Sequence, residues 1–141
     1  DKDRIEAWLY HLLLCATQLQ PTESLFQGKD KREIFQVVSQ QDALTQLQIY
    51  VESYLAGLSQ LQLIPTQGIE AYLKQIANEE AVDVEKCFAQ LTKIAEGDDY
   101  SRGDLYWQRV LVQTQELDLA WINQQVKAWF APMLQAIKRK K

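Results

Sequence analysis

The sequence predicts a mainly α-helical chain with one small β-hairpin, an α+β fold. Apolar residues recur at helical spacing through most of its length. One stretch, "SLFQGKDKREIFQVV" at residues 24–38, alternates instead on both sides of a Gly-Lys-Asp-Lys turn, which is typical of two antiparallel strands. At 141 residues, we expect a single domain or domain fragment over residues 1–141.

The first predicted helix is apolar nearly all round. Its positions at helical spacing are Ile5, Trp8, Leu9, Leu12, Ala16 and Leu19. Tyr10, Leu13 and Leu14 add apolar groups on the other sides, and Pro21 closes the helix. Because such a helix is normally covered on every side, we expect either a central position or a face meant for material outside this chain.

The hairpin is followed by a second helix. Leu25 and Gln27 precede the turn, and the second strand runs through Ile34 to Val38. Ser39 offers an N-cap with Asp42 at the third helical position, and Gly57 can terminate the helix. Its apolar stripe consists of Leu44, Leu47, Val51, Tyr54, Leu55 and Leu58.

Three further segments are predicted before the last helix. "LQLIP" at residues 61–65 is predicted to be extended, because Pro65 restrains the residue before it, and is a candidate short strand. Thr66 is expected to cap a helix that carries Ile69, Tyr72, Leu73 and Ile76. A further helix ends at Gly97 and carries Val84, Cys87, Phe88, Leu91 and Ile94.

The last helix is predicted to begin at Thr114. One face carries Leu119, Ile122, Val126, Trp129, Phe130, Met133 and Ile137. We expect Pro132 to kink this helix, because its ring removes one amide donor and crowds the carbonyl four residues earlier.

The charge is divided between an acidic body and a basic end. The net charge is −4, and the four residues Lys138, Arg139, Lys140 and Lys141 supply +4, which leaves −8 on the other 137 residues. An acidic body repels phosphate, so we expect weak non-specific DNA binding and a tail that is a solvated end.

Several classes of protein are disfavoured. The longest apolar run, Leu12 to Ala16, is far too short to cross a bilayer, so no membrane contact is expected. The two cysteines lack metal-ligand spacing and no secretory leader opens the chain, so both are expected to stay reduced in a cytoplasmic protein. Since a helix begins almost at Asp1, we expect a fragment of a longer protein.

The stretch "EGDDYSRGDLYWQRVL" at residues 96–111 is the strongest candidate for a site. Its four carboxylates lack the alternating oxygen-ligand spacing of a calcium loop, so we predict no metal site. Ser101 with Asp104 three residues later indicates instead a capping-box-like helix start.

Tyr106, Trp107 and Arg109 fall in the first turns of that helix. Trp107, Val110 and Leu111 can share an apolar face, which favours core packing. The alternative is contact with nucleic-acid bases or a partner protein, and Tyr106, Trp107 and Arg109 are the candidate contact residues.

His11 is the only histidine, which excludes a zinc site built on paired histidines. Cys15 lies one helical turn away, within reach, but the pair lacks a third group to orient the imidazole, so we predict a satisfied or edge histidine. No Gly-rich phosphate loop or nucleophile elbow occurs. We therefore predict no catalytic residue, no metal and no cofactor.

The order of these elements resembles a known family. The segments are "RIEAWLYHLLLCA" at 4–16, "SLFQGKDKREIF", "YVESYLAGLSQLQLIP", "GIEAYLKQ", "AEGDDYSRGDLYWQRVL" and "FAPML". In this order and spacing they resemble the C-terminal region of RecC, the gamma subunit of exodeoxyribonuclease V, over nearly the whole chain. The landmark positions are Trp8, His11, Tyr54, Gly57, Leu58, Pro65, Gly97, Tyr106, Arg109 and Pro132.

The resemblance implies a part of a heterotrimeric helicase and nuclease that processes double-strand breaks for recombinational repair. It implies the helical C-terminal part of an inactive, restriction-endonuclease-like nuclease domain. The expected role is a non-catalytic docking and scaffold module, with the alpha and beta subunits as partners and DNA reached through the assembled complex.

A sequence motif bears on that loss of activity. Nucleases of this fold need an acidic residue two positions before a lysine, so that metal and base act together. No Asp-x-Lys or Glu-x-Lys occurs in this sequence, and Asp83-Val84-Glu85-Lys86 has the wrong spacing. The alternative is the helical end of an active nuclease whose catalytic strands lie upstream of Asp1.

Overall fold

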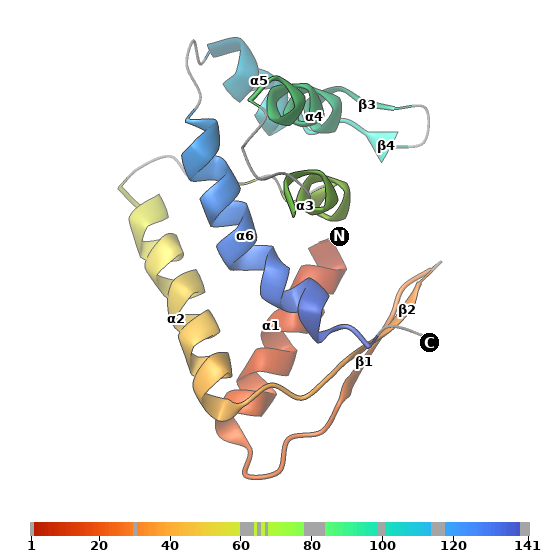
Figure 1. Ribbon diagram of the computed structural model, residues 1–141, viewed down its shortest axis with the longest axis vertical. Coiled ribbons are helices and arrows are strands. Elements are labelled where there is room, and N and C mark those ends of the chain that lie inside the picture. The colour runs from red at the N-terminus through yellow and green to blue at the C-terminus, as the bar shows by residue number, and fades with distance from the viewer. Residues whose placement is uncertain are drawn as a thin grey trace. The chain divides into compact units, whose positions relative to one another are not determined.

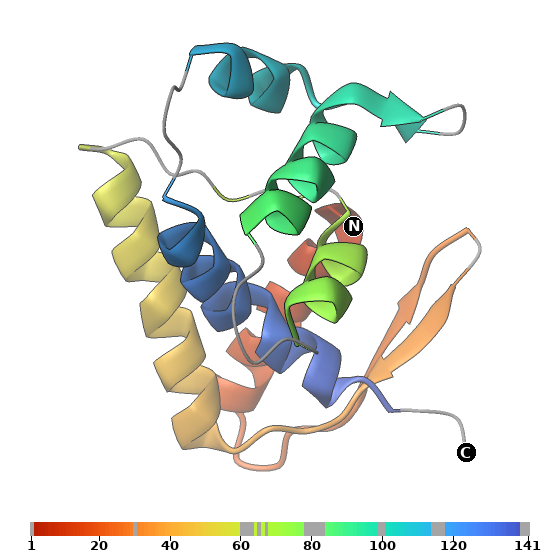
Figure 2. The ribbon, with the colours of Figure 1, turned by 45° about the horizontal axis from the view of Figure 1, so that its top comes forward.

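The computed structural model describes residues 2–29, 31–59, 64, 66, 68–77, 84–98, 101–113 and 118–138. Within these residues the protein is mostly helical, with two small antiparallel sheets of two strands each, which confirms the predicted α+β class (Figure 1, Figure 2). The chain divides into two compact units, one of residues 1–62 and 128–141 and the other of residues 63–127. That residues 1–141 form a single domain stays a prediction.

The two units contain different elements. Those of the first unit are α1 (Lys2–Thr17), β1 (Ser24–Gln27), β2 (Arg32–Phe35), α2 (Gln40–Gly57) and the later turns of α6 (Leu119–Ala136). Those of the second unit are α3 (Ile69–Ala77), α4 (Val84–Glu96), β3 (Gly97–Asp98), β4 (Ser101–Arg102), α5 (Leu105–Gln113) and the early turns of α6.

α1 buries one face and leaves the opposite face open. Trp8 and Leu12 are buried on the side that belongs to the core, and α1 packs against α2. Tyr10, Leu13 and Leu14 are 61, 48 and 41 % exposed. The helix is therefore apolar on several sides, as predicted, but it is not covered on every side.

A buried ion pair joins α1 to the hairpin. Nε of Arg4 lies 2.6 Å from Oε2 of Glu33 on β2, and the two side chains are only 6 and 14 % exposed. Breaking a buried pair leaves an uncompensated charge away from water, so this contact holds β2 in one position against α1.

The predicted hairpin is confirmed. β1 and β2 pair antiparallel with Leu25 opposite Ile34. The turn closes where the Gly28 amide donates to the Lys31 carbonyl at 2.8 Å. The predicted turn residues therefore set the register of the strands.

The second strand ends at Phe35, three residues before the predicted end at Val38. The backbone beyond that point bonds to the segment that follows α6. The Gln36 amide donates to the Ala136 carbonyl at 2.7 Å, and the Lys138 amide donates to the Ile34 carbonyl at 2.9 Å. Phe35 and Ile137 thereby form an antiparallel bridge, so Ile137 is not helical as the periodicity predicted.

The predicted cap of α2 is confirmed. Oγ of Ser39 accepts a hydrogen bond from the Asp42 amide at 3.1 Å, which satisfies one free donor of the first turn. The helix ends at Gly57, as predicted, and Leu58 follows in a right-handed conformation with φ −72° and ψ −22°. The left-handed freedom of glycine is therefore not used here.

Pro132 lies inside α6 and leaves one carbonyl without its helical donor. Since proline has no N–H, the Ala128 carbonyl, four residues earlier, loses the bond it would normally accept. Nε2 of Gln46, on α2, donates to this carbonyl at 2.9 Å. Gln46 is only 7 % exposed, so a buried amide replaces the missing backbone donor.

Tyr50 makes the neighbouring connection. Its hydroxyl donates to the carbonyl of Trp129 and accepts from Nε1 of Trp8, 3.1 Å away. Nε1 of Trp129 donates to Oγ of Ser53 at 3.0 Å, and the Tyr50 and Trp129 rings meet edge to face at 5.4 Å. Burial raises the pKa of Tyr50, so the phenol stays a neutral donor. The side chains of α2 thus tie α1 to the later turns of α6.

The second unit has its own core. Its buried side chains are Ile69, Tyr72, Leu73, Leu91, Ile94, Ala95, Trp107, Val110, Leu119, Ile122, Asn123 and Val126. The Tyr72 hydroxyl donates to Oδ1 of Asn123, so the polar groups in this core are satisfied.

The start of α3 differs from the prediction. The helix begins at Ile69, and the Tyr72 amide donates to the Gly68 carbonyl at 3.0 Å, so Gly68 and not Thr66 stands at its N-terminus. Gly68 has a φ of 64°, a left-handed conformation that suits glycine. The predicted extended segment 61–65 lies, except for Ile64, outside the described residues.

Two other helix starts also differ from the prediction. α5 begins at Leu105 because Oδ1 of Asp104 accepts from the amides of Tyr106 and Trp107 at 2.9 and 3.2 Å. Ser101 lies in β4, so Asp104 is the cap. α6 begins at Leu119, with Oδ1 of Asp118 accepting from the Trp121 amide at 2.9 Å, whereas Thr114 lies outside the described residues. Aspartates take the cap positions assigned to hydroxyl side chains.

We predict that Gln46→Leu lowers the free energy of unfolding by about 1–3 kcal/mol, because the Ala128 carbonyl would be left buried without a donor. Urea unfolding followed by Trp fluorescence measures this loss. Gln41→Leu, at an exposed position of the same helix, is the matched control and is expected to change the value by less than about 0.5 kcal/mol.

A double-mutant cycle tests the reason for the loss. Pro132→Ala restores an amide at position 132 that can donate to the Ala128 carbonyl. Gln46→Leu should therefore cost less in the Pro132→Ala background than in the wild-type chain. Equal costs in the two backgrounds would show that Gln46 does not compensate for the proline.

Candidate functional site

The acidic stretch at residues 96–111 forms a tight connection between two helices. β3 and β4 pair antiparallel with Gly97 opposite Arg102. Gly97 has a φ of 78° and ends α4, as predicted. Because left-handed backbone favours glycine, this position fixes where the chain leaves the helix.

The end of α4 is closed by residues of the following segment. A Cβ placed on Gly103 would lie 2.2 Å from the Ala95 carbonyl oxygen and 2.5 Å from that of Glu96. Nε2 of Gln108 donates to the Ala95 carbonyl at 2.7 Å, and the Asp104 amide donates to the Ile94 carbonyl at 3.3 Å. The stretch therefore satisfies helix ends, which is a structural role.

The three candidate contact residues differ in exposure. Trp107 is 1 % exposed and lies in the core of its unit, while Tyr106 is 46 % exposed and Arg109 is exposed. The rings of Tyr106 and Trp107 meet edge to face at 6.5 Å. Stacking with a base requires an open ring face, so only Tyr106 and Arg109 are accessible in this structure. Contact with a partner or a DNA strand stays a prediction for them.

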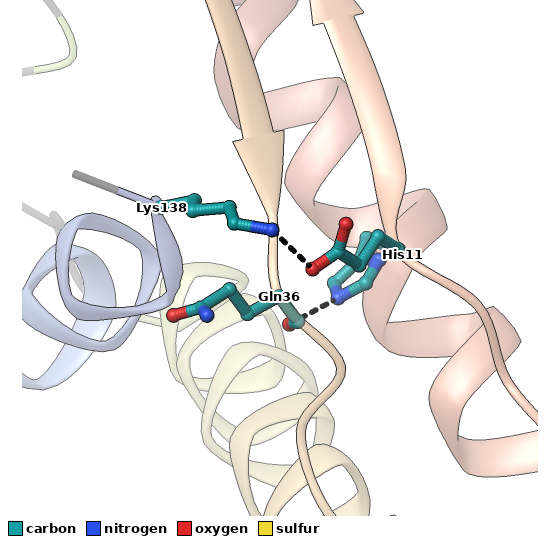
Figure 3. A network of polar contacts seen from close by, with 4 residues as sticks. His11, Gln36 and Lys138 are labelled. Atoms are coloured by element: carbon teal, nitrogen blue, oxygen red, sulfur yellow. Dashed lines mark hydrogen bonds and ion pairs between the residues drawn. The ribbon is translucent and has the colours of Figure 1, made fainter. Parts of the chain in front are cut away.

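His11 is fully buried, and its ring points to the backbone carbonyl of Gln36 (Figure 3). Nε2 lies 3.0 Å from the carbonyl oxygen of Gln36, and Nδ1 lies 2.8 Å from Oγ of Ser24. Since a carbonyl only accepts, Nε2 carries the proton and Nδ1 accepts from the hydroxyl. The ring also stacks on Trp8 at 5.6 Å and packs against Phe35. The prediction of a satisfied histidine is confirmed.

Cys15 does not form a catalytic pair with His11. Its Sγ lies 3.5 Å from Nε2, the nitrogen that carries the proton, so that nitrogen cannot take a proton from the thiol. Cys15 is 0 % exposed, and the ring is held by a hydroxyl and a carbonyl instead of a carboxylate. The contact is a structural one within α1.

Two observations concern metals and membranes. Within the described ranges, no group of three or more His, Cys, Asp or Glu side chains is placed to hold a metal ion. No helix in the described part of the chain combines the length and the hydropathy of a membrane span.

The most conspicuous surface feature is an apolar stripe on α2. We define the α2 stripe as Leu44, Val51, Tyr54, Leu55 and Leu58, which are 48, 56, 68, 56 and 70 % exposed. These are residues of the predicted apolar stripe, and of that set only Leu47 is half-buried. Apolar periodicity alone marked them, but it gave no sign that a different side of the helix would be packed.

The packed side of α2 follows a second helical series. Ala43, Gln46, Tyr50 and Ser53 recur at intervals of three and four residues, and they are buried or bonded to α1 and α6. A small residue and polar side chains thus occupy the interior side, and large apolar ones the exterior.

A cavity of about 450 Å³ adjoins this packed side. Its lining residues are Trp8, Leu12, Gln36, Val37, Val38, Asp42, Thr45, Gln46, Pro132, Gln135 and Ala136. Polar amides and apolar groups alternate around it, and Asp42 is its charged lining residue. The amides of Gln36, Gln46 and Gln135 and the hydroxyl of Thr45 give it hydrogen-bonding capacity.

We predict that Gly103→Ala destabilises the chain by several kcal/mol or prevents folding, because the added methyl would overlap two carbonyl oxygens. Thermal unfolding measures the effect. Gly28→Ala is the matched control, since the nearest atom to its Cβ would be 3.4 Å away, an ordinary contact. Equal melting temperatures for the two variants would contradict the prediction.

We predict that His11 loses its charge at an unusually low pH. Burial lowers the pKa of His11, while the hydrogen bond to the Gln36 carbonyl opposes this to a smaller extent. The unfolded ring binds a proton below about pH 6.5, before the folded ring does, so stability is full above this pH and falls as the pH drops toward the folded pKa.

The ¹H NMR spectrum gives a direct measurement of the pKa of His11. His11 is the only histidine, so its ring proton is a single probe, and its titration midpoint should lie below 6.5 in the folded chain. In His11→Gln the stability loss between pH 7 and pH 5 should be smaller. A midpoint at or above 6.5 would contradict the prediction.

Comparison with known proteins gives the family. Residues 1–77 match the family model described as the RecC C-terminal domain, a span that contains α1, the hairpin, α2 and α3. The chain is 32 % identical over 147 aligned residues to the RecBCD enzyme subunit RecC of Haemophilus influenzae, across 99 % of this chain and 13 % of that relative's length. With more than half of its residues matched by the model, this chain belongs to the RecC family.

Proposed function

We propose that this chain is a non-catalytic docking and scaffold module of the gamma subunit of the cytoplasmic exodeoxyribonuclease V helicase–nuclease complex. In this role it acts in double-strand break processing and recombinational DNA repair. The family membership supports the proposal, as does the similarity to a relative that is a subunit of the RecBCD enzyme.

The observation that carries the docking role is the amount of exposed apolar surface in the first unit. The α2 stripe and the open face of α1, which contains Tyr10, Leu13 and Leu14, present large side chains to solvent. Burying one such side chain stabilises an interface by about 1.5–3 kcal/mol. Large exposed apolar side chains grouped along a helix are typical of protein–protein contact.

The sequence and the buried polar groups favour binding over chemistry. The sequence contains no acidic residue two positions before a lysine. The one histidine is buried, and its proton lies on the nitrogen beside Cys15. These groups stabilise the fold, and the proposed activity of the exposed apolar faces is binding.

The proposed partners are the alpha and beta subunits, and DNA is reached through the assembled complex. The helical, restriction-endonuclease-like relationship belongs to the same proposal. Its alternative is the helical end of an active nuclease, which requires an acidic-x-Lys strand upstream of Asp1.

We predict that a gamma subunit from which the region corresponding to this chain has been deleted no longer retains the alpha subunit. The reason is that the apolar faces of α1 and α2 would be missing. Co-purification of the tagged gamma subunit with the alpha and beta subunits measures retention. The intact gamma subunit is the control. Undiminished retention would remove the docking role.

The same purified proteins test the proposal that this region has no nuclease activity. The purified full gamma subunit should not cut linear DNA in the presence of Mg²⁺, with the complete complex as the positive control. Mg²⁺-dependent cutting by the gamma subunit that is lost when an acidic residue upstream of Asp1 is replaced would support the alternative instead.

A further inference from the structure

We infer that the α2 stripe binds a basic amphipathic helix of a partner subunit. This inference rests on the proposed docking function and names the surface and the chemistry of the contact. The stripe lies along one side of a single helix, which suits an occupant of the same shape.

The spacing of the stripe matches a helix-packing surface. Leu44, Val51, Leu55 and Leu58 are separated by seven, four and three residues, so they lie along one face, with Tyr54 beside them. Each is about half exposed or more. A ridge of this kind fits the groove between side chains of a second helix.

The stripe is held outward by the packed side of α2. Gln46 and Tyr50 bond to carbonyls of α6, and Ser53 accepts from Trp129. These contacts prevent α2 from turning its apolar residues inward. The stripe is therefore a preformed surface, which lowers the entropic cost of binding.

The charge beside the α2 stripe favours a positively charged partner. The helix contains no lysine or arginine, and of its two carboxylates Asp42 lines the cavity on the packed side, so Glu52 is the charge beside the stripe. Glu52 follows Val51 at the border of the stripe, and Nε2 of Gln48 donates to its Oε1 at 2.7 Å, which leaves the second carboxylate oxygen for a cation. A lysine or arginine beside the apolar residues of the partner would complement this border.

The same charges disfavour a second copy of this chain. Two α2 helices would bring like-charged carboxylates together in an acidic protein. Five side chains that are about half exposed or more on one helix present less area than the roughly 800 Å² per partner of a standard protein interface. One docked helix, and not a second globular copy, matches this area.

Photo-crosslinking identifies the occupant. Val51 is replaced by photoreactive benzoylphenylalanine in the full gamma subunit, which is assembled with purified alpha and beta subunits. We expect a crosslink to a basic helix of one of these subunits, mapped by mass spectrometry. A crosslink to a second gamma subunit, a crosslink only within the gamma subunit, or no crosslink would overturn the inference.

Charge substitutions at Val51 test whether the partner helix is positively charged. Val51→Lys removes apolar contact and adds repulsion, so the Kd for the crosslinked subunit should rise at least tenfold. Val51→Glu removes the same contact but adds attraction, so the Kd should rise less, and the gap between the variants should narrow with added salt. Equal affinities, or weaker binding by Val51→Glu, would contradict a basic partner.

Leu25→Lys is the matched control. Leu25 is 55 % exposed on β1, so the substitution adds the same charge at similar exposure away from α2. It should leave the Kd within twofold of wild type, and an increase equal to that of Val51→Lys would overturn the inference.

The gamma subunit without the region corresponding to this chain distinguishes the docking function from the role of the α2 stripe. If the truncated gamma subunit loses the partner while the Val51 variants keep wild-type affinity, the α2 stripe is not the contact and the docking function stands. If the truncated subunit keeps the partner, the docking function itself is wrong.

Discussion

The packing of the first unit depends on the backbone N–H that α6 lacks at Pro132. Pro132 deprives the Ala128 carbonyl of its helical donor, and Gln46 supplies a side-chain donor in its place. Tyr50 bonds to the next carbonyl along α6 and accepts from Trp8 on α1. Because these groups are buried and directional, they specify the rotation of α2 about its own axis, which apolar contacts alone would leave less defined.

The local elements could be predicted from the sequence because their causes lie within a few residues. The Gly-Lys-Asp-Lys turn, the Ser39 cap and the left-handed Gly97 each act on neighbouring backbone. The starts of α5 and α6 were placed too early, since Asp104 caps α5 in place of Ser101 and Asp118 caps α6. Several capping side chains lie close together there, and their rank is decided by the backbone path.

The outward side of α2 could not be predicted, because its cause lies far away in the sequence. Periodicity identified the α2 stripe but not the donor that Gln46 provides to a carbonyl 82 residues later. A glutamine on a glutamine-rich helix gives no local signal of burial. A satisfied or edge histidine was predicted for His11, whereas its partners Ser24 and Gln36 depended on how the hairpin folds back.

The orientation of α2 follows from a comparison of free energies. Turning the helix by about a third of a turn would bury part of the stripe, and each large side chain so buried would contribute about 1.5–3 kcal/mol. The same rotation would leave the Ala128 carbonyl, the Tyr50 hydroxyl and the Trp8 indole N–H without these partners, at about 1–3 kcal/mol each. The two terms are similar in size, and the rotation would also force Gln46 out of its site. The buried hydrogen bonds therefore offset the apolar gain of rotation, and the apolar side chains that the fold leaves exposed remain available to a partner helix.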